Sequence, residues 1–110
     1  MSMGKQYTVA WASSADEDLR SIIDYIAHDD PDMALTILGR LRNAASALTS
    51  LPYRGRIVPE LQAFGITVYR EILSLPWRLI YRIDGRRVFV LSLLDSRRNI
   101  EDILLDRLIR

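Results

Sequence analysis

The sequence predicts a single α+β domain, in the order β-α-α-β-β-β-α, in which a helical hairpin packs on a small twisted antiparallel sheet. The first observation is a long stretch, residues 14–51, whose apolar residues recur at helical spacing and which one proline divides in two. The second is a set of three strand-like runs within residues 66–94, with a hairpin dipeptide, Asp84-Gly85, before the last. A chain of 110 residues, 49% of them hydrophobic, is long enough for one core, so we expect one domain over residues 1–110.

The first half of the chain is expected to form a short strand and two helices. Residues 7–11 alternate as in a strand. Ser14, followed three residues later by Glu17, is typical of a capping box at the first helix. Asp30 before Pro31 is typical of an N-cap followed by the first residue of the second helix. The buried stripes of the two helices are expected to contain Leu19, Ile22, Ile23, Ile26, Ala34, Ile37, Leu38, Leu41, Ala44, Ala45, Leu48 and Leu51.

The second half is expected to form a sheet of consecutive strands. It begins with a basic loop, "PYRGRIVPEL", at residues 52–61. A two-residue type I′ turn at Asp84-Gly85 sets the register of the last two strands and places Tyr81 opposite Val88. The three predicted strands span residues 66–74, 77–83 and 87–94.

The connection "SLPW" between the first two of these strands permits two loop lengths. A two-residue loop places Glu71 on the face of Arg78 and Arg82. A three-residue loop places Arg70 there instead, because a slip of one residue moves every side chain to the other face. We favour the shorter loop, in which Glu71 pairs with one of the arginines.

Residues 99–110 are predicted to form a closing helix with Asn99 as its N-cap. One apolar stripe contains Ile100, Ile103, Leu104 and Leu108. Leu105 and Ile109 fall outside it, and a helix that is apolar nearly all round needs two partners. We therefore expect Leu105 and Ile109 to contact a second chain, either a partner protein or another copy.

The composition excludes several kinds of site. The chain has no cysteine, which excludes disulfides, thiol catalysis and cysteine-bound zinc. His28 is the only histidine, too few for a histidine-rich metal site, and there is no glycine-rich phosphate loop. We expect no metal and no cofactor. Because no apolar run is long enough for a signal peptide or a membrane span, we also expect a cytoplasmic protein without a membrane partner.

Positive charge is concentrated in the second half of the chain, almost entirely as arginine. Residues 36–110 hold thirteen basic and seven acidic residues, whereas residues 1–35 hold two basic and seven acidic residues. Arginine arrays bind phosphate backbones or acidic protein segments through charge-assisted hydrogen bonds, and the alternative is a salt-bridged solvent face. Arg86 and Arg87 flank an exposed turn and are expected to serve solubility. The residues that we predict to bind a target are Arg78, Arg82, Arg97 and Arg98.

Three stretches resemble the RelE/ParE superfamily of toxins from bacterial type II toxin–antitoxin pairs. They are "DLRSIIDYIAHDDPDMA", "LTSLPYRGRIVPEL" and "YREILSLPWRLIYRIDGRRVFVLSLLDSRRNIEDIL", and the resemblance extends from about Tyr7 to Ile109. It implies a helical hairpin on a small twisted antiparallel sheet, and a growth-arresting toxin of the plasmid-stabilisation type. It also implies a cognate antitoxin that wraps the toxin. The assembly would be a homodimer of this chain or a toxin–antitoxin heterotetramer. Leu105 and Ile109 would then contact the antitoxin or the second copy.

Two activities occur in the superfamily. The RelE-like branch cleaves mRNA on the ribosome, with lysine and arginine on a sheet face and a histidine or tyrosine near the C-terminus. If this chain were such a ribonuclease, its catalytic residues would be Arg78, Arg97, Arg70 and Glu71. The tyrosine and histidine positions of that branch hold Ile103 and Asp95 here.

These departures favour the ParE-like branch, which inhibits DNA gyrase without known catalytic residues of its own. Arginine stays protonated far above neutral pH and is a poor general base. The main prediction is therefore a gyrase inhibitor, and the alternative is a ribosome-dependent mRNA endoribonuclease, so whether the chain is an enzyme stays open. A third interpretation is a non-catalytic binding module for an acidic protein partner.

Overall fold

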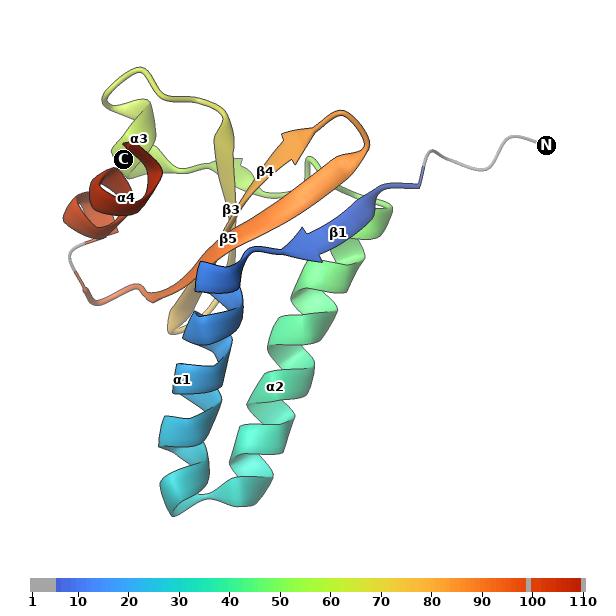
Figure 1. Ribbon diagram of the computed structural model, residues 1–110, viewed down its shortest axis with the longest axis vertical. Coiled ribbons are helices and arrows are strands. Elements are labelled where there is room, and N and C mark those ends of the chain that lie inside the picture. The colour runs from blue at the N-terminus through green and yellow to red at the C-terminus, as the bar shows by residue number, and fades with distance from the viewer. Residues whose placement is uncertain (1–5, 99, 110) are drawn as a thin grey trace.

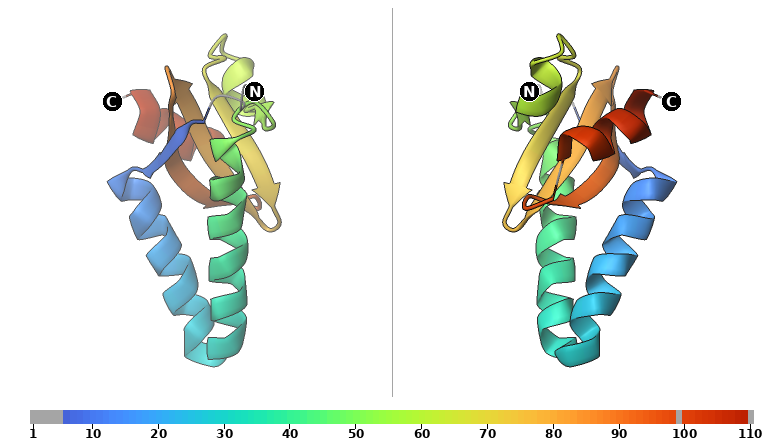
Figure 2. Two further views of the ribbon diagram at one scale, coloured as in Figure 1. Left: turned by 90° about the vertical axis from the view of Figure 1, so that its right-hand side faces the viewer. Right: turned by 90° about the vertical axis from the view of Figure 1, so that its left-hand side faces the viewer.

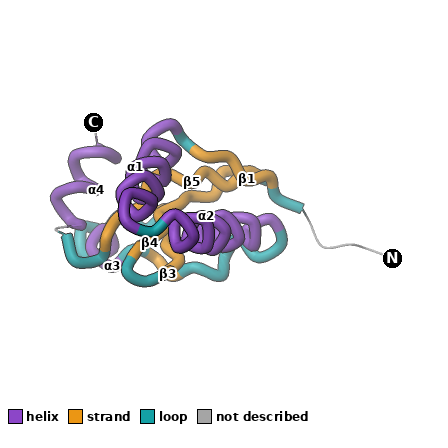
Figure 3. Tube along the Cα trace, turned by 90° about the horizontal axis from the view of Figure 1, so that it is seen from below, coloured by secondary structure: helices purple, strands orange, loops and turns teal. Residues whose placement is uncertain are grey.

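The computed structural model describes residues 6–98 and 100–109, and a five-stranded sheet lies between two layers of helices (Figures 1 and 2). Helices α1 (Ser13–Asp29) and α2 (Pro31–Ser46) form a hairpin on one face and extend well beyond the sheet (Figure 1). Helix α4 (Ile100–Ile109) and the one-turn helix α3 (Pro59–Gln62) lie together on the other side (Figure 3). This is the α+β class that the sequence predicts.

The strands follow the order β1-β5-β4-β3-β2 across the sheet. Their bounds are β1 (Thr8–Trp11), β2 (Arg56–Ile57), β3 (Tyr69–Ser74), β4 (Trp77–Asp84) and β5 (Arg87–Asp95). All neighbours are antiparallel except β1 and β5, which are parallel, so the predicted antiparallel sheet is confirmed apart from this pair. A parallel pair needs a long crossover, and the intervening helices and strands supply it. The expected basic loop contains β2 and α3, both too short to give a periodic signal.

The hairpin between β3 and β4 has the shorter of the two predicted loops. Its two connecting residues are Leu75 and Pro76, joined by a cis peptide bond. Glu71 pairs with Ile80 in the adjacent strand and therefore lies on the same face as Arg78. The predicted loop length is confirmed.

The hairpin between β4 and β5 differs from the prediction by two residues. Its turn is at Gly85-Arg86 rather than Asp84-Gly85, and Tyr81 pairs with Val90 instead of Val88. Only the first turn residue has a positive φ, 61°, which is the pattern of a type II′ turn rather than type I′. Because this shift of register is even, the side chains between the turn and the bulge keep their predicted faces of the sheet. A β-bulge next to Tyr81 then shifts the remaining pairs by one more residue.

The start of α2 is confirmed, and the start of α1 is not. The backbone N of Met33 donates to Oδ1 of Asp30 at 3.0 Å, so Asp30 is the N-cap of α2. Helix α1 has Ala12 as its N-cap, without a side-chain cap. Ser14 Oγ instead donates to the carbonyl oxygen of Leu91 at 2.8 Å, so the predicted capping box is wrong and this hydroxyl ties α1 to β5.

Two hydrophobic clusters hold the layers together, one on each face of the sheet. The cluster under the hairpin has at its centre Ala15, Leu19, Ile37, Leu41, Ala45, Leu48, Leu79, Tyr81, Val88, Val90 and Leu93. The smaller cluster under α3 and α4 contains Val58, Leu61, Ile80, Leu94 and Leu104. Leu51, which we expected in the helical stripe, is 60% exposed because the helix gives way to a 3-10 turn at Ala47–Thr49.

Helix α4 uses more of its surface within the chain than the sequence indicates. Leu104 is fully buried, and Ile103 and Leu105 are partly buried against the same cluster. The expectation that Leu105 points away from the body of the protein is therefore wrong, whereas its contact with a second chain stays a prediction. Asn99 and the side chains of Ile100, Leu108 and Ile109 lie outside the described residues.

Candidate functional site

Arg78 lies at the centre of a buried ion-pair network. Its Nε donates to Oε1 of Glu71 at 2.6 Å, and its Nη1 and Nη2 each donate to a carboxylate oxygen of Glu60 at 2.6 Å. The other oxygen of Glu71 accepts from Nε of Arg56 at 2.6 Å. The Arg78 side chain is only 7% exposed. The expectation that Arg78 lies on an accessible face is therefore wrong.

Three elements bring this network together. Glu71 on β3 and Arg78 on β4 share a face because the loop between the strands has two residues, and their predicted pairing is confirmed. Glu60 comes from α3, which folds back over that face, 18 residues from Arg78 in the sequence. Sequence reasoning missed Glu60, since Pro59-Glu60 indicates a helix start and nothing about what that helix covers.

Glu60 and Arg78 each favour the charged form of the other. Hydrogen bonds from Arg78 lower the pKa of Glu60 below its ordinary 4.5, although partial burial acts in the opposite direction. Its bond to Glu60 also raises the pKa of Arg78. Neither group therefore exchanges protons near pH 7, and the arrangement is suited to fixing α3 on the sheet rather than to acid–base chemistry.

The lowered pKa of Glu60 predicts an acid-sensitive contribution to stability. A carboxylate whose pKa is depressed in the folded state stabilises the fold above about pH 4.5 and loses this contribution as the pH falls through its folded pKa. We expect Glu60→Gln to lower the free energy of unfolding at pH 7, and the difference from the parent to shrink as the pH falls below 4.5. Urea unfolding at pH 7, 5, 4 and 3 measures the difference. Asp24→Asn, which removes an exposed carboxylate from α1, is the control, and an equal pH profile for both variants would contradict the assignment.

A second cluster of charge lies beside an open groove of about 470 Å³ between α1 and the end of the sheet where β4 begins and β5 ends. Tyr25, on the α1 side, is 82% exposed. The groove is lined by Asp18, Ser21, Ile22, Tyr25, Ile26, Trp77, Leu93, Asp95, Arg97 and Arg98. It thus combines aromatic and aliphatic side chains with two exposed arginines.

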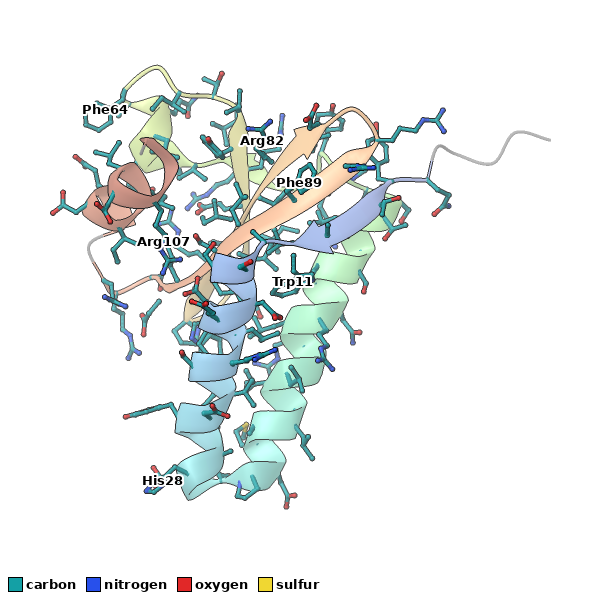
Figure 4. The ribbon with its side chains drawn as sticks, in the orientation of Figure 1. Trp11, His28, Phe64, Arg82, Phe89 and Arg107 are labelled. Atoms are coloured by element: carbon teal, nitrogen blue, oxygen red, sulfur yellow. The ribbon has the colours of Figure 1, made fainter. Side chains whose placement is uncertain are left out.

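Most charges at this groove are already paired. Asp95 accepts from Nε and Nη2 of Arg97 at 2.9 and 2.5 Å, and these bonds lower the pKa of Asp95 to about 2. Asp18 accepts from Nη1 of Arg107 at 2.7 Å, which fastens α4 to α1 (Figure 4). Arg98 makes no ion pair within the described ranges. It is therefore the cation at this groove with most to gain from an anionic partner.

The remaining predicted residues lie elsewhere. Arg82 is opposite Phe89 on the neighbouring strand (Figure 4), with its side chain 43% exposed and a nitrogen 3.6 Å from Asp84. Arg70 donates to the carbonyl oxygen of Gly55 at 2.8 Å and does not join the Arg78 network. The structure therefore does not unite the predicted arginines in one site, and target contact by Arg82, Arg97 and Arg98 stays a prediction.

The histidine lies far from the predicted arginines, and the hydroxyl of Tyr81 is held in the core. His28 lies at the far tip of the helical hairpin (Figure 4). Burial raises the pKa of Tyr81, whose hydroxyl donates to the carbonyl oxygen of Pro52 at 2.7 Å. Within residues 6–98 and 100–109, no group of three or more histidines and acidic residues is placed to hold a metal ion. The helices in these ranges are also too short or too polar to cross a membrane.

Comparisons with known proteins identify the family. A family model described as the ParE toxin of the type II toxin–antitoxin system parDE matches residues 9–100. No curated protein gives a significant match. A structure of the chromosomal ParDE toxin–antitoxin system from P. aeruginosa contains a similar chain, with 19% identity and a TM-score of 0.68 over 84% of this chain and 98% of that one. The toxin–antitoxin complex RelBE2 from Mycobacterium tuberculosis contains another, with 25% identity and a TM-score of 0.56 over 82% and 98%. Because the family model spans most of the sequence, the chain belongs to the ParE toxins of type II toxin–antitoxin systems.

Proposed function

We propose that this toxin arrests growth by inhibiting DNA gyrase, without catalysis of its own, and that a cognate antitoxin neutralises it. The observation that supports this most is the state of Arg78 and Glu71. Two of the four residues that a RelE-type ribonuclease would use are held together in a buried network with Glu60. They reinforce the fold and have almost no surface to offer an RNA phosphate.

The competing activity needs acid–base groups effective near neutral pH, and Asp95 does not supply one. Cleavage of RNA requires a base for the ribose 2′-hydroxyl and an acid for the leaving oxygen, both effective near neutral pH. Asp95, at the position of that branch's histidine, has a pKa of about 2, so it is a weak base at neutral pH and is not an acid there. A gyrase inhibitor needs only a binding surface, which the exposed arginines and the groove beside α1 offer.

The groove also suits the antitoxin. The two solved structures described above are of toxin–antitoxin systems. An antitoxin helix or extended segment would place apolar side chains against Trp77 and Tyr25. Acidic residues of the antitoxin would meet Arg98 at the rim. Leu105 and Ile109 remain our proposed contacts for the antitoxin or for a second copy of the chain. We place the pair in the cytoplasm, where gyrase and ribosomes both occur.

A supercoiling assay tests the proposal. The purified chain is expected to inhibit gyrase acting on relaxed plasmid, and the small acidic protein of a neighbouring reading frame to relieve the inhibition. Ribosomes programmed with mRNA are expected to remain uncleaved. Cleavage at defined codon positions would establish the ribonuclease instead, and inactivity in both assays with antitoxin binding retained would favour a binding module.

Matched variants then test the surface. Arg97→Gln with Arg98→Gln removes two charges beside the groove, whereas Arg86→Gln with Arg87→Gln removes two from the exposed turn of the β4–β5 hairpin. If these groove arginines bind the target, the first pair raises the concentration for half-inhibition by about tenfold or more, because charge-assisted hydrogen bonds are lost. The second pair is expected to change it less than about twofold. Equal effects would mean that only net charge matters.

A further inference from the structure

Side chains of the sheet hold the loop before β2 in place through hydrogen bonds. Tyr81, fully buried on β4, donates from its hydroxyl to the carbonyl oxygen of Pro52 at 2.7 Å and accepts from the backbone N of Gly55 at 3.0 Å. Arg70 Nη1 donates to the carbonyl oxygen of Gly55 at 2.8 Å. Three hydrogen bonds to side chains of the sheet thus set the backbone of residues 52–55, and a ligand of this loop need not order it on binding.

The outer side of this loop presents an aromatic ring and cations to solvent. Tyr53 is 60% exposed, and Arg54 and Arg56 are exposed beside it. The guanidinium of Arg70 lies 5.1 Å from the centroid of the Tyr53 ring, in cation–π contact. We call Tyr53, Arg54, Arg56 and Arg70 the basic loop surface.

The charge of this surface is largely uncompensated. Neither Arg54 nor Arg70 forms an ion pair with a carboxylate in the described part of the chain. The two carboxylates of the region, Glu60 and Glu71, are both bound by the buried Arg78. Arg56 shares Glu71, yet its side chain is still 57% exposed. Counting Arg54, Arg56, Arg70 and Arg78 against Glu60 and Glu71, the region has a net charge of +2.

We propose that the basic loop surface binds a single nucleic-acid strand, with a base stacked on Tyr53 and phosphates held by Arg54, Arg56 and Arg70. Sequence-tolerant strand binding combines these two contacts, since every base has a face to stack and every nucleotide a phosphate. Arg56 and Arg70 lie on adjacent strands at the β2 edge of the sheet, with side chains on opposite faces of it. A flexible nucleic-acid strand can cross that edge of the sheet and reach both of its faces.

An acidic peptide fits this surface less well. Peptides that bind by side-chain anchors use a groove, and Tyr53 and Arg54 line neither the groove beside α1 nor the one lined by Trp11 and Arg42. An exposed ring stacked on a guanidinium matches the face of a base and has no counterpart in an acidic side chain. The inference does not depend on the gyrase proposal, because binding is measured in the absence of gyrase.

Fluorescence anisotropy with the purified full-length chain tests it. The probes are a labelled 12-nucleotide DNA strand, the RNA strand of the same sequence, the DNA duplex and a labelled 12-residue acidic peptide, at 50 to 200 mM salt. We expect at least one of the two single strands to bind more tightly than the duplex and about tenfold more tightly than the peptide. The comparison of DNA with RNA identifies which strand is the ligand.

Variants locate the binding. Tyr53→Ala is expected to weaken strand binding by about 5- to 100-fold through lost stacking. Arg54→Gln should reduce the slope of log affinity against log salt by about 0.7, the value for one lost phosphate contact on a single strand. Arg86→Gln, with the same charge change on the β4–β5 turn, should change the affinity less than about twofold. Circular dichroism and thermal unfolding confirm that the variants are folded.

The inference is overturned if no strand binds at 50 mM salt, or if Arg54→Gln and Arg86→Gln weaken binding equally. It is also overturned if Tyr53→Ala leaves the affinity for the nucleic-acid strand unchanged. Binding would then result from the overall positive charge alone and not from stacking. Tighter binding of the acidic peptide than of either strand would assign the surface to a protein partner instead.

Discussion

Replacing Arg78 with methionine is expected to lower the free energy of unfolding by about 3–5 kcal/mol, because the buried Glu71 then keeps only Arg56 and the half-buried Glu60 loses both of its bonds to Arg78. Glu71 is fully buried and Glu60 is bonded to Arg78 through both of its oxygens. Methionine keeps much of the volume of the side chain, so the loss reports mainly the charge and its hydrogen bonds. Urea unfolding at pH 7 measures it.

Arg82→Met is the matched control on the same strand. Its side chain is 43% exposed and its nitrogen is 3.6 Å from Asp84, so we expect a change within about 1 kcal/mol. A double variant, Glu71→Gln with Arg78→Met, should be less destabilised than the sum of the single variants, since the two groups interact directly. If Arg78→Met is as stable as Arg82→Met, the buried network does not hold α3 on the sheet.

Gly55→Ala is expected to cost about 3 kcal/mol or more, because the new methyl group has no space. A Cβ at this position would lie 2.5 Å from the carbonyl oxygen of Glu71 and 2.6 Å from the hydroxyl of Tyr81. The carbonyl oxygen belongs to the backbone of β3, next to its pairing with β2, and has little freedom to move. Thermal and urea unfolding should both show the loss.

Gly39→Ala provides the contrasting control. Apart from the backbone of α2 itself and the two neighbouring residues, no atom lies within 4 Å of a Cβ at Gly39, so we expect a gain of about 1 kcal/mol from helix propensity. A second variant, Gly55→Ala with Tyr81→Phe, should remain destabilised, because removing the hydroxyl leaves the contact with the Glu71 carbonyl. Equal stability of Gly55→Ala and Gly39→Ala would show that the loop before β2 relaxes freely.

The sequence alone determined the elements whose signals are local. The apolar spacing in residues 14–48 predicts both helices of the hairpin, and Asp30 before Pro31 marks where the second begins. Three strands follow from alternation and turn residues, and of the two loop lengths that the sequence permits before Trp77, the favoured shorter one is present. In each case the deciding residues lie within a few positions of one another, so the periodicity and chemistry of one segment suffice.

The tertiary structure decided what depends on distant segments. The parallel pairing of β1 with β5 joins the two ends of the fold, and the bond between Arg107 and Asp18 spans 89 residues. The groove beside α1 exists only once the end of β5 lies next to that helix. The Ser14 hydroxyl, expected to cap α1, donates to β5 for the same reason.

The two arginines on β4 show the physical cause. Arg78 and Arg82 both follow the strand's alternation, and in the sequence each is an arginine among apolar neighbours. Helix α3 covers one and brings Glu60 to it, while the other remains 43% exposed. Whether an arginine on a strand meets a partner or water depends on what packs over it. The packing of α3 and α4 is fixed by the burial of Val58, of Leu61 on α3 and of Leu104 on α4 against the sheet, all of them far from Arg78 in sequence.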